Sequence, residues 1–382
     1  MVYLDNAATT IPDDAVLEII KQELSESYAN PSALYSEGLK ARKTIEQARG
    51  TIAGVFGCDS QELYFTATGT EANNIAVLGA ARARANFGNE IIITGYEHSS
   101  IYATALSLKE EGFTVHTVDP AHCGKVETND ILSKVNSRTA LVAVMQVNNE
   151  TGAVINVGDL SGRVKEINQR TAFHSDMVQG FMKYPVNLKQ CGIDTAAISA
   201  HKIHGPKGIG ALFVRKGFNI KPVIFGGGQE RGLRSGTENA AYAAAFAKAA
   251  VVFDTKESFS QAESLNSYAR DKLSLIDGVI INSPEDASVF ILNISLPGYR
   301  SETLLRFLDD EGIMVSSGST CSKGAASHTL VSMGLDTDRV DSSIRISFSK
   351  NNKKEDIDLL RELLERAKKR LIHKNDKRQA VS

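Results

Sequence analysis

The stretch Leu63-Tyr64-Phe65-Thr66-Ala67-Thr68-Gly69-Thr70-Glu71 begins with a short apolar run and continues into small, hydroxylated residues. The run predicts a strand, and the small residues predict the start of a helix. The same alternation of short apolar runs with longer amphipathic segments continues to Val214. It predicts strands at Leu63–Thr66, Ile91–Thr94, Thr114–Val118, Ala140–Met145, Ala172–Ser175, Ala196–Ser199 and Ala211–Val214, with helices at Glu71–Arg84, Ile101–Glu111 and Asp159–Gln169. Strands separated by helices indicate an α/β fold with a mostly parallel seven-stranded sheet.

Beyond this unit, an alanine-rich helix is predicted from Asn239 to Val252. The remaining segments mix predicted helices at Glu263–Leu275, Glu302–Glu311 and Lys353–Ile372 with strands near Val279–Ile281, Val289–Ile294 and Ser343–Ser347. A chain of 382 residues exceeds one ordinary core. We therefore expect a large domain of residues 14–253. Residues 1–13 and 254–382 would form a smaller α+β domain that carries the loop around Cys321.

Composition excludes several classes of protein. The formal net charge is −2, so no overall field favours nucleic acid or an anionic membrane surface. The sequence shows no membrane span, and its first residues lack a basic region followed by an apolar run, so we expect a cytoplasmic protein. The four cysteines form no C-x-x-C pair, and no metal site or disulfide framework is predicted.

The residues after the first strand form a candidate anion site. Small residues at a helix N-terminus leave backbone N–H groups free to bind a phosphate, here at Gly69 and Thr70. The alternative is an ordinary helix start capped by Thr68 or Thr70.

Two later strands are each followed by an ionisable side chain. Asp176 follows one, and Ser199-Ala200-His201-Lys202 follows the next. Ligands of such sheets bind at the carboxyl ends of the strands. A lysine that forms a Schiff base and a carboxylate that pairs with a pyridinium nitrogen are the groups that pyridoxal phosphate (PLP) requires. The alternative is a surface lysine and a capping aspartate.

Other candidates follow neighbouring strands. His98 could stack on a planar cofactor and move protons, or merely cap a helix. Asn148 and Asn149 could donate to a ligand, or belong to a turn. The glycine-rich loop from Gly226 to Thr237 could bring Thr237 to a phosphate, although glycine-rich loops are common.

The most unusual stretch is Ser316-Ser317-Gly318-Ser319-Thr320-Cys321-Ser322-Lys323-Gly324. Cysteine is usually buried, and its placement among small polar residues predicts a reactive thiol on an exposed loop, the alternative being an incidental loop cysteine. Arg345, on a predicted strand, could clamp a substrate carboxylate with its planar fork, or form a surface ion pair.

Together these motifs resemble those of the cysteine desulfurases (NifS/IscS-like enzymes) of the class-V aminotransferase family, which have the PLP-dependent transferase fold type I. The resemblance covers nearly the whole chain. It is carried by Tyr3 to Thr10, Asn30-Pro31-Ser32, Thr70 to Asn74, Glu97-His98, Val147 to Glu150, Asp176 to Gln179, His201-Lys202, Gly205 to Gly210, Arg234 to Thr237, Ser317 to Cys321 and Ser343 to Arg345.

The resemblance implies a role for each matching residue. Lys202 would hold PLP covalently, Asp176 would bind its ring nitrogen, Gln179 its phenolic oxygen, and His98 would stack on the ring and transfer protons. Gly69, Thr70, Ser199 and His201 would bind the phosphate, with Thr237 supplied by the other protomer of a homodimer that shares its active sites. Asn149 and Arg345 would hold the carboxylate of L-cysteine, and Cys321 would take its sulfur as a persulfide, leaving L-alanine.

Four departures from the family are visible, and the two that follow Cys321 leave the sulfur acceptor open. Thr68 stands where the family usually has glycine, and Tyr35 where histidine is frequent. The segment after Cys321 and the tail after Leu371 look shorter than in the housekeeping iron–sulfur enzymes. An iron–sulfur scaffold protein and a tRNA- or cofactor-thiolation enzyme are both compatible acceptors.

Two alternative functions remain at this stage. A selenocysteine lyase or a small-amino-acid aminotransferase would share the fold, but an aminotransferase has no need of Cys321. A catalytically silent adaptor could keep the fold and would have no need of Lys202.

Overall fold

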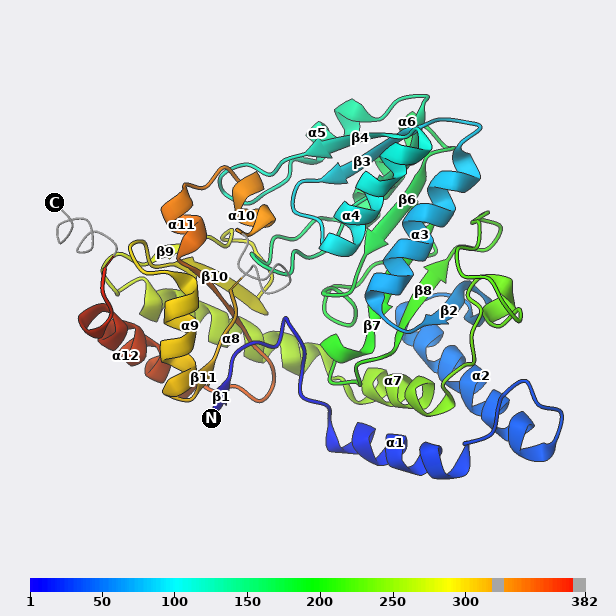
Figure 1. Cartoon of the computed structure of the whole chain (residues 1–382), viewed down its shortest axis with the longest axis horizontal. Helices are drawn as coiled ribbons and strands as arrows, with labels where there is room; N and C mark the ends of the chain where they lie inside the picture. Colours follow the sequence, from blue (N-terminus) through cyan, green and yellow to red (C-terminus); the bar gives the residue numbers. More distant parts are fainter. Residues whose placement is uncertain (318–325, 374–382) are drawn as a thin grey trace.

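The computed structural model describes residues 1–317 and 326–373, and a seven-stranded sheet dominates it (Figure 1). The strand order is β2-β8-β7-β6-β5-β3-β4, and all neighbours pair in parallel except β8, which runs antiparallel to β2 and β7. The strands are β2 (Leu63–Thr66), β3 (Glu90–Thr94), β4 (Thr114–Val118), β5 (Thr139–Ala143), β6 (Ala172–Asp176), β7 (Thr195–Ser199) and β8 (Gly210–Val214). The predicted α/β class and mostly parallel sheet are confirmed.

Helices cover both faces of this sheet, which explains why its strands are nearly continuous apolar runs. On one face, α3 (Gly69–Arg84) and α4 (Ser99–Ser107) bury Val77, Ala80 and Ile101 against the sheet. On the other face lie α2 (Ser36–Phe56), α6 (Val157–Ile167) and α7 (Ala240–Val252). Two further helices complete this part, α1 (Asp14–Glu26), which packs on α7, and α5 (Thr128–Lys134).

The C-terminal part forms a second, smaller α+β unit. Its antiparallel sheet has the order β12-β10-β9, from β9 (Ile280–Ile281), β10 (Ile291–Ser295) and β12 (Ser343–Ser347). The helices α8 (Thr255–Leu273), α9 (Ser301–Asp310) and α12 (Lys354–Arg370) bury their apolar stripes on it. The short elements α10 (His328–Ser332), α11 (Thr337–Asp341) and β11 (Ile313–Met314) complete the unit.

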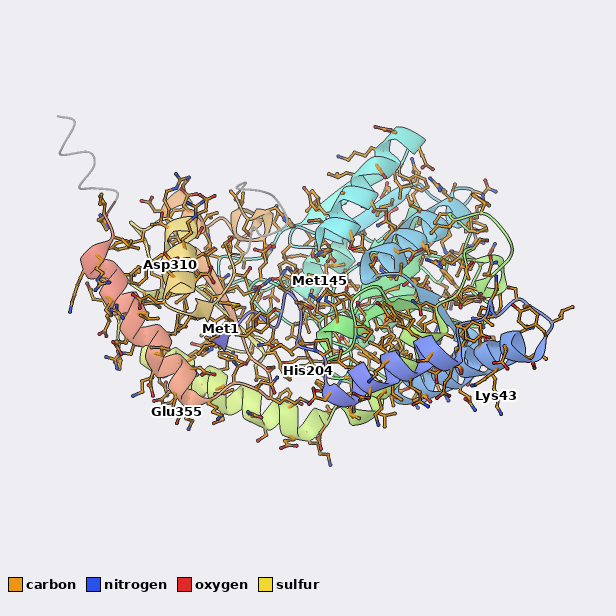
Figure 2. The ribbon with its side chains drawn as sticks, turned by 60° about the horizontal axis from the view of Figure 1, so that its bottom comes forward. Met1, Lys43, Met145, His204, Asp310 and Glu355 are labelled. Atoms are coloured by element: carbon orange, nitrogen blue, oxygen red, sulfur yellow. The ribbon has the colours of Figure 1, made fainter. Side chains whose placement is uncertain are left out.

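The N-terminus joins this second unit before the chain enters α1. Strand β1 (Val2–Tyr3) pairs in parallel with β11, and Asn6 Nδ2 donates to the Ser347 carbonyl over 2.9 Å. In Figure 2, Met1 lies with Asp310 and Glu355, while Lys43 of α2 lies at the other end of the molecule. The domain boundaries at residues 13/14 and 253/254 stay a prediction. Among the helices of the described residues, none is both long and apolar enough to cross a membrane.

Candidate active site

The predicted ionisable residues meet at one edge of the large sheet. Asp176 ends β6, and Ser199 ends the neighbouring parallel strand β7. A short 3-10 turn (Ala200–Lys202) then follows β7 directly and brings Lys202 over the sheet edge. Figure 2 shows Met145, two residues beyond β5, near the middle of the molecule between the two units. This edge therefore faces the smaller unit.

Lys202 is buried, and its Nζ donates to the carbonyl oxygens of Ala7 and Ala8 over 2.6 and 2.7 Å. Burial lowers the pKa of Lys202 from its ordinary 10.5 to about 7, with a smaller contribution from the cation of Arg345. An amine in this state is partly uncharged at neutral pH. The uncharged amine is the form that attacks a carbonyl carbon.

Asp176 is buried and held by two donors. Its Oδ2 accepts from Asn73 Nδ2 over 2.7 Å, and its Oδ1 accepts from the Val178 N–H over 2.9 Å. Both oxygens are thereby fixed, and the carboxylate acts electrostatically on Lys202 and on His98.

His98 caps the N-terminus of α4. Its Nδ1 accepts from the Ser100 N–H over 3.1 Å and lies 2.8 Å from Ser100 Oγ. Burial lowers the pKa of His98, against the influence of Asp176 and assisted by Lys202. The neighbouring Glu97 is fully buried, and burial raises its pKa to about 8. The capping role and the catalytic role considered for His98 are thus compatible.

The N-terminus of α3 has the features of the predicted anion site. Thr68 is the N-cap, and its Oγ1 accepts from the Glu71 N–H over 3.0 Å. A Cβ at Gly69 would lie 2.7 Å from Val178 Cγ2 and 3.6 Å from Ser199 Cβ, so glycine is required there. The first N–H groups of a helix have no partner within it. Gly69, Thr70 and Ser199 therefore lie together, and the departure at Thr68 supplies a cap.

Two other predicted residues contact the N-terminal segment. Gln179 Nε2 donates to the Ala7 carbonyl over 2.8 Å, the same oxygen that Lys202 contacts. His201 Nδ1 lies 3.2 Å from Thr9 Oγ1, and burial lowers the pKa of His201 to about 3, which keeps its ring neutral.

Arg345 extends from β12 of the smaller unit and is buried. Its Nη1 donates to the Asn149 carbonyl and its Nη2 to Asp5 Oδ1, both over 2.8 Å. Asn149 thus meets Arg345 through its backbone. Arg345 Nε is buried without a hydrogen-bond partner in residues 1–317 and 326–373. An arginine with an unused donor can still bind a carboxylate.

Cys321 lies outside the described residues, but both ends of its segment are described. Before it, Ser316 pairs with Arg345 through two backbone hydrogen bonds of 2.6 and 3.2 Å. After it, Ser327 Oγ donates to Glu150 Oε2 over 2.5 Å, and His328 Nε2 donates to the Glu97 carbonyl over 2.7 Å. The segment therefore begins and ends beside the groups described above.

The three described cysteines, Cys58, Cys123 and Cys191, form no disulfide with one another. Burial raises the pKa of the Cys58 thiol to about 12, so little thiolate forms at neutral pH. Cys58 is therefore unsuited to a nucleophilic role.

Thr237 is exposed, at the end of the glycine-rich loop. With Ala67 and Gly208 it lines a cavity of about 230 Å³. The loop is tied to the start of α3 because Arg234 Nε donates to Glu71 Oε1 over 2.8 Å. That Thr237 serves the other protomer stays a prediction.

Several residues of the site were not predicted. Asn73, Ser100, Asp5 and Glu150 contact, in that order, the predicted residues Asp176, His98, Arg345 and Asn148, but received no role from the sequence. A polar residue on the sheet-facing side of α3 was the available signal for Asn73.

The donor set fits PLP. An amine with a lowered pKa suits the aldehyde, a fixed carboxylate suits the ring nitrogen, and an open helix N-terminus with an obligatory glycine suits the phosphate. Among the residues that the structure describes, no cluster of histidine, cysteine and carboxylate side chains could hold a metal ion.

Comparison with known proteins assigns the family. The family model described as "Aminotransferase class-V" matches residues 2–360. The chain belongs to this family. Class-V aminotransferases and the cysteine desulfurases among them are PLP-dependent enzymes.

Curated relatives within the class-V family are cysteine desulfurases. Cysteine desulfurase IscS of Clostridium botulinum is 37% identical over 373 residues, which cover 95% of this chain and 93% of that protein. Cysteine desulfurase 2 of Trichormus variabilis is 36% identical over 95% of this chain and 92% of its own length.

Solved structures agree with this assignment. A structure described as a NifS-like protein superposes with a TM-score of 0.91 at 36% identity, over 97% of this chain and all of that one. A second, described as SspA in complex with cysteine, gives a TM-score of 0.81 at 32% identity, over 91% and 99% of the two chains. The fold is therefore the PLP-dependent fold type I.

Proposed function

We propose that this protein is a cysteine desulfurase that transfers sulfur from L-cysteine to Cys321. The observation that carries the proposal is the meeting of Lys202, Asp176 and Arg345 at one sheet edge, with both ends of the Cys321 segment attached beside them. The names of the relatives support the same activity. L-cysteine and the Cys321 thiol become L-alanine and a Cys321 persulfide, so no external oxidant or reductant is needed.

The proposed residue roles follow from the geometry. Bound at Lys202, PLP supplies an electron sink for charge at the substrate Cα and Cβ. Arg345 holds the substrate carboxylate with donors that Asn149 and Asp5 already orient. The Asp176 carboxylate would stay charged and pair with the ring nitrogen of the bound cofactor. Lys202, whose pKa is lowered to about 7, can accept and return a proton near neutral pH.

His98 and Cys321 complete the proposed machinery. Neutral His98 accepts at Nδ1 from a backbone N–H, so its own proton is on Nε2, where it can be donated. Cys321 acts as the nucleophile toward the substrate sulfur and holds it as a persulfide. We further propose that a sulfur-acceptor protein, either an iron–sulfur scaffold or a thiolation enzyme, receives this sulfur in the cytoplasm.

We also propose a homodimer in which the partner's Thr237 contributes to the phosphate site. Large apolar side chains support it, because Leu34 is 89% exposed and Phe225 is 81% exposed. Phe225 directly precedes the glycine-rich loop that ends at Thr237. Exposed apolar side chains of this size favour a protein partner.

The activity is tested by Cys321→Ser and Lys202→Ala. Cys321→Ser should keep the visible cofactor absorbance of the purified protein and lose persulfide and alanine formation from cysteine. Lys202→Ala should not be labelled when borohydride reduces the loaded protein. Alanine formation at the unaltered rate in Cys321→Ser would refute the desulfurase. Transfer of ³⁵S from the loaded enzyme to candidate acceptors would then identify the acceptor.

A further inference from the structure

Asn73 is a polar residue in an apolar place. It is 1% exposed, on the side of α3 where Ala72 and Ala76 pack on the sheet. A buried amide is unfavourable unless its donors and acceptor are hydrogen-bonded. Here all are used: Nδ2 donates to Asp176 Oδ2 over 2.7 Å and to Ser100 Oγ over 2.8 Å, and Oδ1 lies 3.0 Å from His174 Nε2.

The direction of every bond in this cluster can be assigned. The Asp176 carboxylate accepts, so the nitrogen of the Asn73 amide must face it. Asn73 Oδ1 then accepts, and the proton of His174 is on Nε2. His174 Nδ1 in turn accepts from Thr195 Oγ1 over 2.9 Å. Burial lowers the pKa of His174 to about 3, so the ring stays neutral and its proton stays in place.

We propose that Asn73 is a positioning residue that orients the Asp176 carboxylate for the cofactor, and that His174 and Thr195 lock the amide in the required orientation. The inference rests on the proposed function, because it takes Asp176 as the carboxylate at the ring nitrogen. Hydrogen bonds to a carboxylate favour its charged form. Asn73 thus helps Asp176 to keep its charge opposite the ring nitrogen instead of withdrawing the ring proton.

The second hydrogen of the amide is donated to Ser100, which contacts another predicted catalytic group, His98. Asn73 donates to Ser100 Oγ, which leaves the Ser100 hydroxyl hydrogen free to point at His98 Nδ1, 2.8 Å away. Together with the Ser100 N–H, this keeps Nδ1 of His98 an acceptor. One amide therefore connects the Asp176 carboxylate, through Ser100, with the proton-bearing ring of His98.

The test compares the loaded enzyme with Asn73→Ala and with Asn266→Ala. Asn266 is the matched control because it is also buried and donates to the Val289 and Ile291 carbonyls in the smaller unit. The readout is the pH midpoint of the visible cofactor absorbance, without substrate. Loss of a hydrogen bond to a charged group changes an ionisation equilibrium about 10- to 100-fold.

Asn73→Ala should move this midpoint upward by about one pH unit or more. Without Asn73, the Asp176 carboxylate would bind the proton of the cofactor ring nitrogen more tightly. The cofactor ring would then be less positive, and the Lys202 nitrogen bonded to the cofactor would be more basic. Asn266→Ala should lower thermal stability without moving the midpoint. If the unaltered protein is coloured and the midpoint of Asn73→Ala does not move, this inference alone is overturned. A colourless unaltered protein would overturn the proposed function and this inference with it.

A second pair of variants covers the case in which Asn73→Ala does not fold. His174→Gln keeps a donor toward Asn73 Oδ1, and His174→Phe removes it. The midpoint of His174→Gln should stay near that of the unaltered enzyme, and that of His174→Phe should rise. Equal midpoints in the two variants would contradict the locking role.

Discussion

At the scale of single residues, Lys202 shows most directly how burial and nearby charge set the pKa of a reactive group. Its amine is enclosed between the sheet edge and the N-terminal segment, where it contacts carbonyl oxygens and lies within the field of Arg345. Burial disfavours the ammonium form. The group is thus poised near neutral pH, as a lysine that forms a covalent bond with a carbonyl must be.

This pKa predicts how cofactor uptake depends on pH. The pKa of Lys202 is lowered to about 7, so below pH 7 the amine is mostly charged and above it mostly free. The rate at which cofactor-free protein develops visible absorbance with added PLP should rise through pH 7 and level off by about pH 8. Stopped-flow absorbance measures it, with Lys202→Arg as the blank. A rate that still rose tenfold per unit at pH 9 would indicate an ordinary lysine.

Arg345 yields a prediction about substrate binding. Arg345→Gln should raise the KM for cysteine about 10- to 100-fold, the usual loss for a hydrogen bond to a charged group, and leave the cofactor absorbance unchanged. Arg270→Gln is the control, since Arg270 bonds the Pro284 carbonyl and Asn266 Oδ1 in the same unit. Steady-state kinetics decide the matter, and an unaltered KM would remove Arg345 from the substrate site.

Site residues that end or follow a strand could be predicted from the sequence. Residues that contact them from another helix or segment could not. Asp176 and Lys202 follow consecutive parallel strands, whose carboxyl ends lie at one edge in any α/β sheet. Asp5 reaches Arg345 across 340 positions, and Asn73 reaches Asp176 across 103. Such contacts depend on how whole elements pack, which periodicity does not specify.

At the scale of elements, a buried ion pair joins α2 to the glycine-rich loop. Arg49 Nη1 and Nη2 donate to the two oxygens of Glu230 over 2.7 and 2.9 Å, and the two side chains are 4% and 1% exposed. Glu230 also accepts from the Phe65 N–H of β2 over 2.9 Å. One carboxylate therefore fixes a helix, a strand and the loop relative to one another.

Removing that carboxylate should be costly. Glu230→Ala removes the buried partner of Arg49 and leaves its charge paired with the largely exposed Glu46. Loss of a buried partner typically lowers the free energy of unfolding by up to about 3–5 kcal/mol. Glu26→Ala breaks the half-exposed pair with Lys40 and should cost less than about 1 kcal/mol. Urea denaturation of the two variants compares these values. Equal stability losses would mean that Glu230 has no special anchoring role.

Several helices and strands differ from the prediction in their ends, their presence or their direction. The predicted strands β2, β4 and β12 are confirmed residue by residue, and the remaining predicted strands differ by one or two residues at their ends. Helices α1 and α2 were not predicted, although Ala41, Ile45, Ala48 and Ile52 recur at helical spacing. The antiparallel direction of β8 was also not predicted. A short connection after Lys202, instead of a crossover helix, returns the chain in the opposite direction.

At the scale of the whole molecule, the N-terminal residues connect its two units. Residues up to Asn6 pair with the C-terminal unit, and Ala7 and Ala8 contact Lys202 of the large sheet. We expected residues 1–13 to belong with the C-terminal unit, although no periodicity in so short a segment specifies its partner. The active site is thus built from three separate parts of the chain.

The proposed homodimer predicts a linked loss of assembly and cofactor affinity. Leu34→Asp places a charge among the exposed apolar residues that we assign to the interface, where burying an unpaired carboxylate is unfavourable. The variant should elute as a monomer in size exclusion with light scattering. It should also bind PLP more weakly, because the partner's Thr237 would be missing from the phosphate site.

The control for this variant lies at the other end of the molecule. Ile372, just beyond α12, is also exposed, and α12 lies far from α2 (Figure 1). Ile372→Asp should leave both mass and PLP affinity unchanged. If Leu34→Asp became monomeric and yet bound PLP as tightly as the unaltered protein, the dimer would stand but the shared phosphate site would not. A Leu34→Asp protein that stayed dimeric would instead place the interface elsewhere on the surface.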